Sequence, residues 1–258
     1  MVFHEYGKEN HEAIIFIHGF LAPWQVLTPQ IDWFSKEYHI IVPVLDGHNP
    51  EDGSIFSTIP DAAKDISDYY VQNYGTDIFA VFGMSMGGAI ASSLWMDKNL
   101  KIRKLFLEAA PLVGQPKMLS AIILKQYISL THKTQRRHAQ TLKTCEETFM
   151  PKQYMQPFLT MVDAMSDESI RNSVVSTSGF RLPADMDTTH TEIMYCYGTT
   201  LNEVLSKKSA RYLKTHYKNA KIVCKEGYAH CELSLRRPLE CNQLIDDFLH
   251  NSILQQSQ

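Results

Sequence analysis

The segment from Ile78 to Ala89 constrains the fold more than any other part of the chain. It reads IFAVFGMSMGGA, an apolar run followed by the pattern Gly-x-Ser-x-Gly and then by small residues. This order predicts a buried strand, a tight turn centred on Ser85 and a closely packed helix. Gly83 and Gly87 are expected where a side chain would collide with the neighbouring strand or helix. Such a turn holds the serine hydroxyl clear of the backbone, so Ser85 is a candidate nucleophile, and a purely structural turn is the alternative.

With the strand before the turn and the helix after it, this segment resembles the nucleophile elbow of the α/β-hydrolase family. The resemblance implies a mostly parallel sheet, a Ser–acid–His triad in that chain order and an oxyanion hole formed by backbone amides. A second segment, residues 13–20 (AIIFIHGF), is an apolar strand that ends in His-Gly, as the family's oxyanion loop does. By this resemblance, the two oxyanion donors are the backbone amides of Phe20 and Met86. We interpret His18 itself as a buried histidine with a satisfied hydrogen bond.

A histidine near the end of the chain is the candidate base. Residues 220–230 (AKIVCKEGYAH) form a short expected strand and a glycine-containing loop that ends at His230. In the α/β-hydrolase family, the base lies in the loop after the last strand. An imidazole suits this task because serine is a poor nucleophile near neutral pH and histidine titrates in that range.

The acid of the triad departs from the family pattern. The family places an Asp or Glu three residues after the glycine that ends the preceding strand, and here Leu201 stands at that spacing from Gly198. Glu203 is the nearest carboxylate and the first candidate, if the loop carries a small insertion. Glu108, at the end of an earlier strand, is the second candidate, and Asn202 or no acid at all is a further alternative. Glu203 is also compatible with a simple structural role, as a first-turn acid in a helix capped by Asn202.

Strands and helices are expected to alternate along the chain, which predicts parallel strands joined by crossover helices. The expected strands cover residues 13–18, 39–45, 78–83, 103–108, 191–197 and 221–225, and the expected helices cover 60–73, 86–97, 203–217 and 236–250. The fold class is therefore α/β, and the resemblance implies the α/β-hydrolase fold with a mostly parallel sheet. After the second of these strands, the turn that contains Asp46 and His48 is interpreted as structural, and neither residue is assigned to catalysis.

A long segment interrupts this alternation between the fourth and fifth expected strands. It spans about eighty residues, far more than one crossover helix needs. We therefore expect residues 111–188 to form an inserted helical cap, and residues 1–110 and 189–258 to form the hydrolase core. Within the segment, residues 109–145 contain Lys and Arg but no Asp or Glu. This stretch is either a cap helix with a solvated basic face and an apolar face over a pocket, or a basic lid that attracts an anionic substrate or a membrane surface.

Composition excludes several classes of protein. The chain has 258 residues, of which 44% are hydrophobic, enough to bury a large core. A net charge of −3 gives no general attraction to nucleic acid, and no apolar run is long enough for a membrane-spanning helix. The 5 cysteines fit no metal-binding pattern, and we expect neither a metal nor a cofactor. Cys196 and Cys224 lie in expected strands and are interpreted as small buried hydrophobes in a reducing cytosol. Because the N-terminus lacks the form of a secretory signal, we expect a cytoplasmic protein.

Together these patterns predict a serine hydrolase that cleaves an ester, or a related acyl bond, of a small and largely apolar molecule. Ser85 would attack the carbonyl, His230 would carry the proton and Glu203 would orient the imidazole. Lipase, thioesterase, lactonase and carbon–carbon bond hydrolase activities all remain open, because they share these residues. A ligand sensor or weakly active binding protein on the same scaffold is the alternative, and the missing acid after Gly198 favours it.

Overall fold

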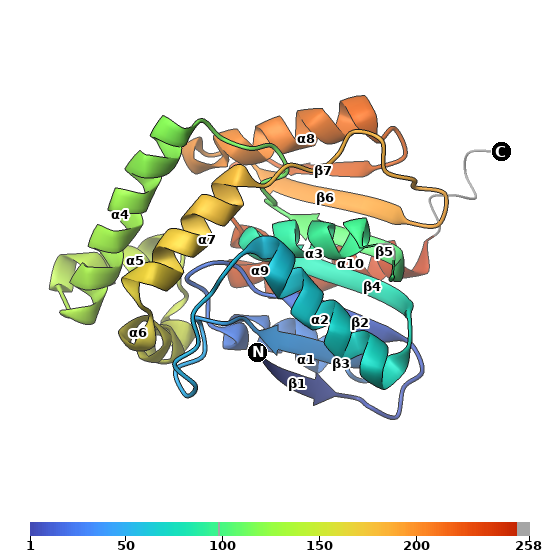
Figure 1. Ribbon diagram of the computed structural model, residues 1–258, viewed down its shortest axis with the longest axis horizontal. Helices are drawn as coiled ribbons and strands as arrows, with labels where there is room; N and C mark the ends of the chain where they lie inside the picture. The colour runs from blue at the N-terminus through green and yellow to red at the C-terminus, as the bar shows by residue number, and fades with distance from the viewer. Residues whose placement is uncertain (98, 252–258) are drawn as a thin grey trace.

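The computed structural model describes residues 1–97 and 99–251. Within these residues, seven strands form one sheet in the order β1-β3-β2-β4-β5-β6-β7 (Figure 1). β1 pairs antiparallel with β3, and every other neighbouring pair is parallel. The mostly parallel α/β sheet is thus confirmed, with β1 as an antiparallel edge strand outside the expected set. The strands are β1 (Val2–Tyr6), β2 (Ala13–Ile17), β3 (His39–Val44), β4 (Asp77–Met84), β5 (Lys101–Glu108), β6 (Glu192–Gly198) and β7 (Lys221–Lys225).

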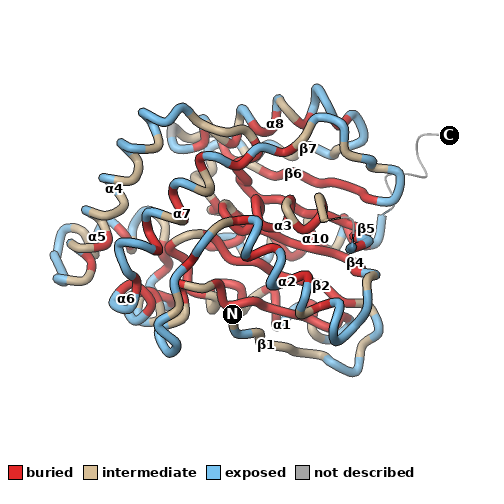
Figure 2. Tube along the Cα trace, in the orientation of Figure 1, coloured by how far each residue is buried: buried red, intermediate tan, exposed pale blue. Residues whose placement is uncertain are grey.

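Helices cover both faces of this sheet, which is why β2 and β4 are apolar along most of their length. In β2, Ile15 and Ile17 belong to the apolar core on one face of the sheet, whereas Ile14 and Phe16 belong to the core on the other face. Figure 2 shows the central strands buried along most of their length. The helices around the sheet are α1 (Thr28–Phe34), α2 (Ile59–Tyr74), α3 (Met86–Met96), α8 (Val204–His216), α9 (Glu232–Arg236) and α10 (Pro238–His250), with short 3-10 turns at η1 (Trp24–Leu27) and η3 (Leu201–Glu203).

The last expected helix, residues 236–250, corresponds to α10, and the separate short helix α9 precedes it. α9 ends at Arg236 and α10 begins at Pro238. Arg237 between them has φ −127° and ψ 50°, outside the helical region. A proline ring disfavours helical backbone in the residue before it, so the chain bends at this point instead of continuing one helix.

A helical insertion separates β5 from β6, as the length of this segment predicts. It comprises α4 (Lys117–Gln135), α5 (Ala139–Thr148), the turn η2 (Lys152–Tyr154), α6 (Met155–Ala164) and α7 (Asp167–Gly179). Figure 1 shows these helices grouped beyond one end of the sheet. Two hydrogen bonds join α7 to the loop before α2: Phe56 N donates to Ser169 Oγ (3.2 Å), and Asn172 Nδ2 donates to Phe56 O (2.9 Å). The division into a core of residues 1–110 and 189–258 and a cap of residues 111–188 stays a prediction.

One expectation about the cysteines is wrong. Cys196 is buried in β6, but Cys224 is exposed, because β7 is the edge strand of the sheet. The cysteines of the described chain are all free. Nowhere in residues 1–97 or 99–251 is there a helix long and apolar enough to cross a membrane.

Candidate active site

Ser85 occupies the turn between β4 and α3 in a strained backbone conformation. Its φ is 51° and its ψ −120°, a region that costs a residue with a side chain about 1–3 kcal/mol. The neighbouring glycines make the turn possible, because a Cβ on Gly83 would lie 2.3 Å from Gly87 O, and one on Gly87 would lie 2.3 Å from Ile17 O. The predicted steric role of both glycines is confirmed. The N–H of Ser85 donates to the carbonyl of Glu108 (2.8 Å), which fixes the turn against β5.

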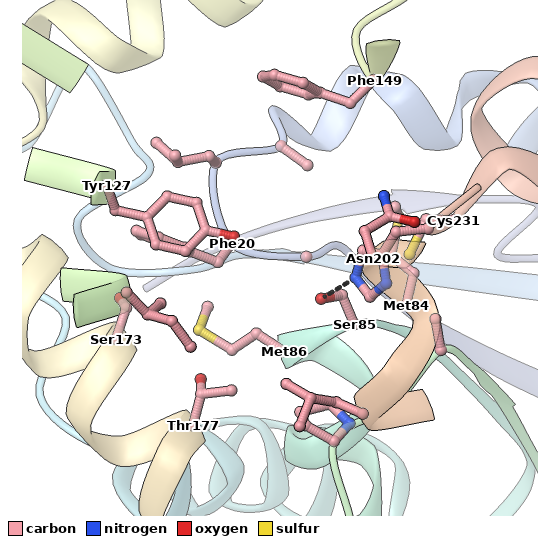
Figure 3. Close-up of a pocket in the computed structure, with 18 of the residues that line it drawn as sticks. Phe20, Met84, Ser85, Met86, Tyr127, Phe149, Ser173, Thr177, Asn202 and Cys231 are labelled. Carbon is pink, nitrogen blue, oxygen red and sulfur yellow. Dashed lines mark hydrogen bonds between the residues drawn. The ribbon is translucent and has the colours of Figure 1, made fainter. Parts of the chain in front are cut away.

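The loop after β2 lies directly against this turn. A Cβ on Gly19 would be only 3.3 Å from Ser85 Cβ, so the next residue, Phe20, comes to the edge of the site. Met86 is the first residue of α3, and an α-helix leaves its first backbone N–H groups without intrahelical partners. Phe20, Ser85 and Met86 line one cavity (Figure 3). The structure therefore places both residues that are predicted to supply oxyanion donors at the cavity that contains Ser85.

His18 is buried and holds two loops together. Its Nδ1 donates to Gly19 O (3.0 Å), and its Nε2 accepts from the N–H of Leu45 (3.2 Å) in the loop after β3. Burial lowers the pKa of His18 to about 3, so the ring is neutral at physiological pH. The interpretation of His18 as a buried histidine with satisfied hydrogen bonds is confirmed.

His48 supports the same loop from the other side. Its Nδ1 donates to Asp46 O (3.2 Å), and its Nε2 accepts from the N–H of Leu21 (3.3 Å). Leu21 has a φ of 54°, so this hydrogen bond stabilises a left-handed residue immediately after Phe20. Burial lowers the pKa of His48 to about 4. The turn after β3 thus supports the loop that carries Phe20, in agreement with its interpretation as structural.

The loops after β6 and β7 are in close contact. A Cβ on Gly198 would lie 2.1 Å from Tyr228 O, a contact that only glycine permits. The N–H of Thr199 donates to the same carbonyl (3.0 Å). These contacts place the segment that carries Glu203 against the segment that carries His230, although the two residues are far apart in sequence.

Three side chains from these separate loops form one hydrogen-bonded chain. His230 Nε2 is 2.8 Å from Ser85 Oγ, a bond drawn as a dashed line in Figure 3, and His230 Nδ1 is 2.6 Å from Glu203 Oε1. Glu203 Oε2 accepts from the N–H of Gly198 (3.1 Å). Because a carboxylate can only accept, Nδ1 of the imidazole donates to Glu203, and Nε2 accepts from the serine hydroxyl. This arrangement can transfer a proton from Ser85 to His230.

The charge of Glu203 is maintained by its hydrogen bonds. Its side chain is fully buried, and burial alone would raise the pKa of the carboxyl. The hydrogen bond and electrostatic attraction of His230, with the N–H of Gly198, outweigh burial and hold the pKa of Glu203 below its ordinary value. Glu203 is therefore an ionised carboxylate at neutral pH.

The other candidate acids face elsewhere. Glu108 Oε1 accepts from the N–H of Ser234 (3.2 Å), and its Oε2 has no hydrogen-bond partner in the described part of the chain. Burial raises the pKa of Glu108 to about 7. Asn202 is exposed, and its Oδ1 accepts from the hydroxyl of Thr200 (2.5 Å). Of the three candidates, Glu203 is the one that the fold brings to the imidazole.

A family model described as the alpha/beta hydrolase fold matches residues 12–136. Together with the topology of the sheet, this match shows that the chain has the α/β-hydrolase fold. Similar solved structures include an α/β-hydrolase family protein from Desulfitobacterium hafniense, with 16% identity, 96% of this chain and 100% of the other covered, and a TM-score of 0.77. A thermophilic esterase from Thermogutta terrifontis has 16% identity, 97% and 94% coverage and a TM-score of 0.73. The enol-lactonase from Burkholderia xenovorans has 16% identity, 97% and 96% coverage and a TM-score of 0.71. These identities show a shared fold alone, and no curated protein sequence matches the chain.

In this α/β-hydrolase, a cavity of about 410 Å³ reaches Ser85 and His230. The sheet core forms one part of its wall, and the insertion contributes residues of α4, α5 and α7. No Lys, Arg, Asp or Glu is among the described residues that line it. Such a lining favours an uncharged ligand, since a buried charge without a partner is costly. Its apolar residues include Phe20, Met84, Met86, Ile123, Tyr127, Leu130, Phe149, Met150, Val174 and Leu235.

The basic stretch of the insertion divides between two faces of α4. Ile123, Tyr127 and Leu130 line the cavity, whereas Lys125 and Lys133 are exposed. This pattern agrees with a cap helix that has a solvated basic face and an apolar face over a pocket. The attraction of this stretch to an anionic substrate or a membrane surface stays a prediction.

Several polar residues of the cavity wall were not anticipated from the sequence, among them Ser173, Thr177 and Gln115. Ser173 and Thr177 come from α7, and Gln115 comes from the loop before α4. The one signal in the sequence is the spacing of the two hydroxyls, four residues apart on one helix face. Across residues 1–97 and 99–251, no group of three or more His, Cys, Asp or Glu side chains could hold a metal ion.

Acid should destabilise this α/β-hydrolase through its two buried histidines. In the folded protein, the pKa values of His18 and His48 are lowered to about 3 and about 4. In the unfolded chain, both histidines have a pKa of about 6.5. The unfolded state therefore holds more protons between about pH 6.5 and pH 4, and the free energy of unfolding falls as the pH falls through this range. At about pH 5, each histidine costs about 2 kcal/mol of stability.

Replacing His48 with glutamine tests this effect, because the amide oxygen can accept from Leu21 without titrating. Urea unfolding near neutral pH and at about pH 5 should show that His48→Gln loses about 2 kcal/mol less than the wild type does. His11→Gln, which removes an exposed histidine, is the control. Equal losses in the wild type and His48→Gln would contradict the assignment of a buried neutral imidazole.

Proposed function

We propose that this α/β-hydrolase is a serine hydrolase that cleaves an ester, or a related acyl bond, of a small and largely apolar molecule. The observation that carries the proposal is the hydrogen-bonded chain from Ser85 Oγ through His230 to Glu203, with distances of 2.8 Å and 2.6 Å. This hydrogen-bonded chain lies at a cavity whose described lining has no Lys, Arg, Asp or Glu and which is large enough for a small substrate.

The proposed reaction begins when Ser85 Oγ attacks the substrate carbonyl and His230 Nε2 takes the hydroxyl proton. Glu203 stabilises the resulting imidazolium through Nδ1. The backbone amides of Phe20 and Met86 donate to the oxyanion, and each good donor contributes about 3–4 kcal/mol to the transition state. His230 then returns the proton to the leaving group, which leaves an acyl group on Ser85. Water activated by His230 attacks this acyl-enzyme, and the second collapse releases the acid and restores Ser85.

A ligand sensor on the same scaffold is the weaker candidate. Its main support was the missing acid three residues after Gly198, and the contact between Glu203 and His230 removes that argument. A pure binding protein has no need for a strained serine in hydrogen-bond contact with an imidazole. Esterases from Thermogutta terrifontis and Exiguobacterium antarcticum are among the proteins with this fold, which supports acyl-bond hydrolysis as the first reaction to test.

The test is a p-nitrophenyl ester series from acetate to palmitate, combined with labelling by a fluorophosphonate probe. We expect turnover of the shorter esters and little of palmitate, because a cavity of about 410 Å³ is at the small end for ligand sites. The probe should attach once per chain, and peptide mapping should place it on Ser85. A folded protein that neither reacts with the probe nor hydrolyses any ester would favour the ligand sensor.

A further inference from the structure

Three polar atoms in the cavity wall are buried without a partner. They are Ser173 Oγ, Thr177 Oγ1 and Gln115 Oε1, and none of them has a hydrogen bond to another described residue. Ser173 is the most deeply placed, with 1% of its surface exposed. All three residues line the cavity that contains Ser85. The wall that faces the nucleophile thus combines apolar packing with unused hydrogen-bonding capacity.

These atoms belong to one side of the cavity. Ser173 and Thr177 are four residues apart on α7, so their side chains share one face of that helix. The N–H of Gln115 donates to Ser178 O (2.8 Å), which holds the loop before α4 against the end of the same helix. Figure 3 shows Ser173 and Thr177 along α7, with Met86 between them and Ser85. The polar atoms therefore lie apart from the reacting carbonyl and its oxyanion donors.

Two other hydroxyls of α7 have hydrogen-bond partners within the protein. Ser169 Oγ accepts from the N–H of Phe56 (3.2 Å), and Ser176 Oγ accepts from the N–H of Ile59 (2.8 Å). Those two hydroxyls face the core, whereas Ser173 and Thr177 line the cavity. A buried polar group without a partner costs about 1–3 kcal/mol, and folded proteins rarely leave one unexplained. A ligand in the cavity would supply the missing partner.

We propose that Ser173, Thr177 and Gln115 form a polar subsite that binds an uncharged hydrogen-bonding group of the substrate. The inference rests on the proposed hydrolase function and adds the substrate class to it. Hydroxyls and a side-chain amide can both donate and accept, so the subsite suits a keto, hydroxyl or amide group. The absence of Lys, Arg, Asp and Glu from the described lining opposes a carboxylate, phosphate or ammonium group there. The substrate is thus an apolar acyl ester with one neutral polar group away from the bond that is cleaved.

Matched esters with and without a keto group test the subsite. One series consists of p-nitrophenyl alkanoates and oxoalkanoates of equal length, with the keto group at successive positions of the acyl chain. The other consists of acetates of matched alcohols and keto alcohols, whose hydrolysis is measured by the release of acetic acid. For at least one keto position, the wild type should prefer the keto ester by about tenfold or more in kcat/KM.

Two variants should remove this preference for the keto ester. Ser173→Ala and Thr177→Val delete the hydroxyls with little change in shape, so the ratio of kcat/KM for keto and plain esters should fall towards one. Thr131→Val is the matched control: Thr131 is 1% exposed and its Oγ1 also lacks a partner, but it is outside the cavity lining. The control should keep the wild-type preference.

A binding measurement gives a result that does not depend on turnover. Methyl pentyl ketone should raise the melting temperature of the wild type more than the alkene of the same shape, in which a CH2 group replaces the carbonyl oxygen. Thr177→Val should show no such difference. The melting temperatures of the unliganded Ser173→Ala and Thr177→Val proteins should not fall, because these substitutions remove unpaired groups.

Two results would overturn the subsite. The first is that the wild type shows neither a preference for keto esters nor a ketone-induced rise in melting temperature, or that both variants keep these effects unchanged. The second is a marked loss of melting temperature in both variants, which would mean that the hydroxyls have partners within the protein. Either result, combined with ester turnover and fluorophosphonate labelling, would leave the proposed hydrolase function in place. Loss of turnover on every ester with a retained ketone-specific shift would instead refute the hydrolase and keep the subsite.

Discussion

Replacing Ser85 with alanine is expected to lower kcat for ester hydrolysis by about 10⁶-fold. The variant retains the oxyanion donors and the cavity but has no oxygen to form the acyl-enzyme, so only the slow reaction with water remains. Its fold should persist, since the elbow depends on the packing of Gly83 and Gly87. The measurement is steady-state hydrolysis of the best p-nitrophenyl ester, together with fluorophosphonate labelling of the purified variant.

Ser93→Ala is the matched control for this experiment. Ser93 is a half-buried serine of α3, the helix that begins immediately after Ser85, and it does not line the cavity. We expect it to keep nearly full activity and normal labelling. Undiminished labelling of Ser85→Ala would refute Ser85 as the nucleophile and point to another serine.

Replacing Glu203 with glutamine is expected to lower kcat by about 10⁴-fold. The amide has nearly the same shape, but its NH2 group can face Nδ1 and favour the tautomer in which Nε2 carries the proton and cannot accept from Ser85. A neutral side chain also cannot stabilise the imidazolium that forms during attack. KM should change much less than kcat, because Glu203 lies behind the imidazole and outside the cavity lining.

Glu108→Gln is the control for this prediction. Glu108 is a buried carboxyl whose pKa is raised to about 7 by burial, so a neutral amide resembles its protonated form. It bonds to the N–H of Ser234, and we expect its replacement to change kcat only a few-fold. The opposite result, a large loss in Glu108→Gln and a small one in Glu203→Gln, would move the acid to the end of β5.

The elbow and the fold class could be predicted because their causes are local. A strand followed by Gly-x-Ser-x-Gly and small residues admits few backbone paths, and a Cβ on either glycine would meet backbone atoms at 2.3 Å. The alternation of strands and helices likewise predicts parallel pairing, which five of the six neighbouring strand pairs adopt. β1 was missed because a short half-buried edge strand has little of the apolar run that identifies the central strands.

The contact between the acid and the base could be named from the sequence only as one of several alternatives. Glu203 and Glu108 are both carboxylates near the end of a strand, and spacing along the chain does not distinguish them. The choice depends on how the loops after β6 and β7 meet, with Gly198 against Tyr228 O. That contact joins segments distant in sequence and results from packing of the whole sheet.

The sequence by itself determined the strand–turn–helix around Ser85, the α/β class and the position of His230 after the last strand, because neighbouring residues and short-range sterics control these features. Only the packing of distant segments decides that Glu203 contacts His230, that β7 exposes Cys224, and that α7 contributes Ser173 and Thr177 to the cavity that reaches Ser85. These features depend on distances between residues from different elements. Such distances are set by the packing of both faces of the sheet and of the insertion, and no local pattern encodes them.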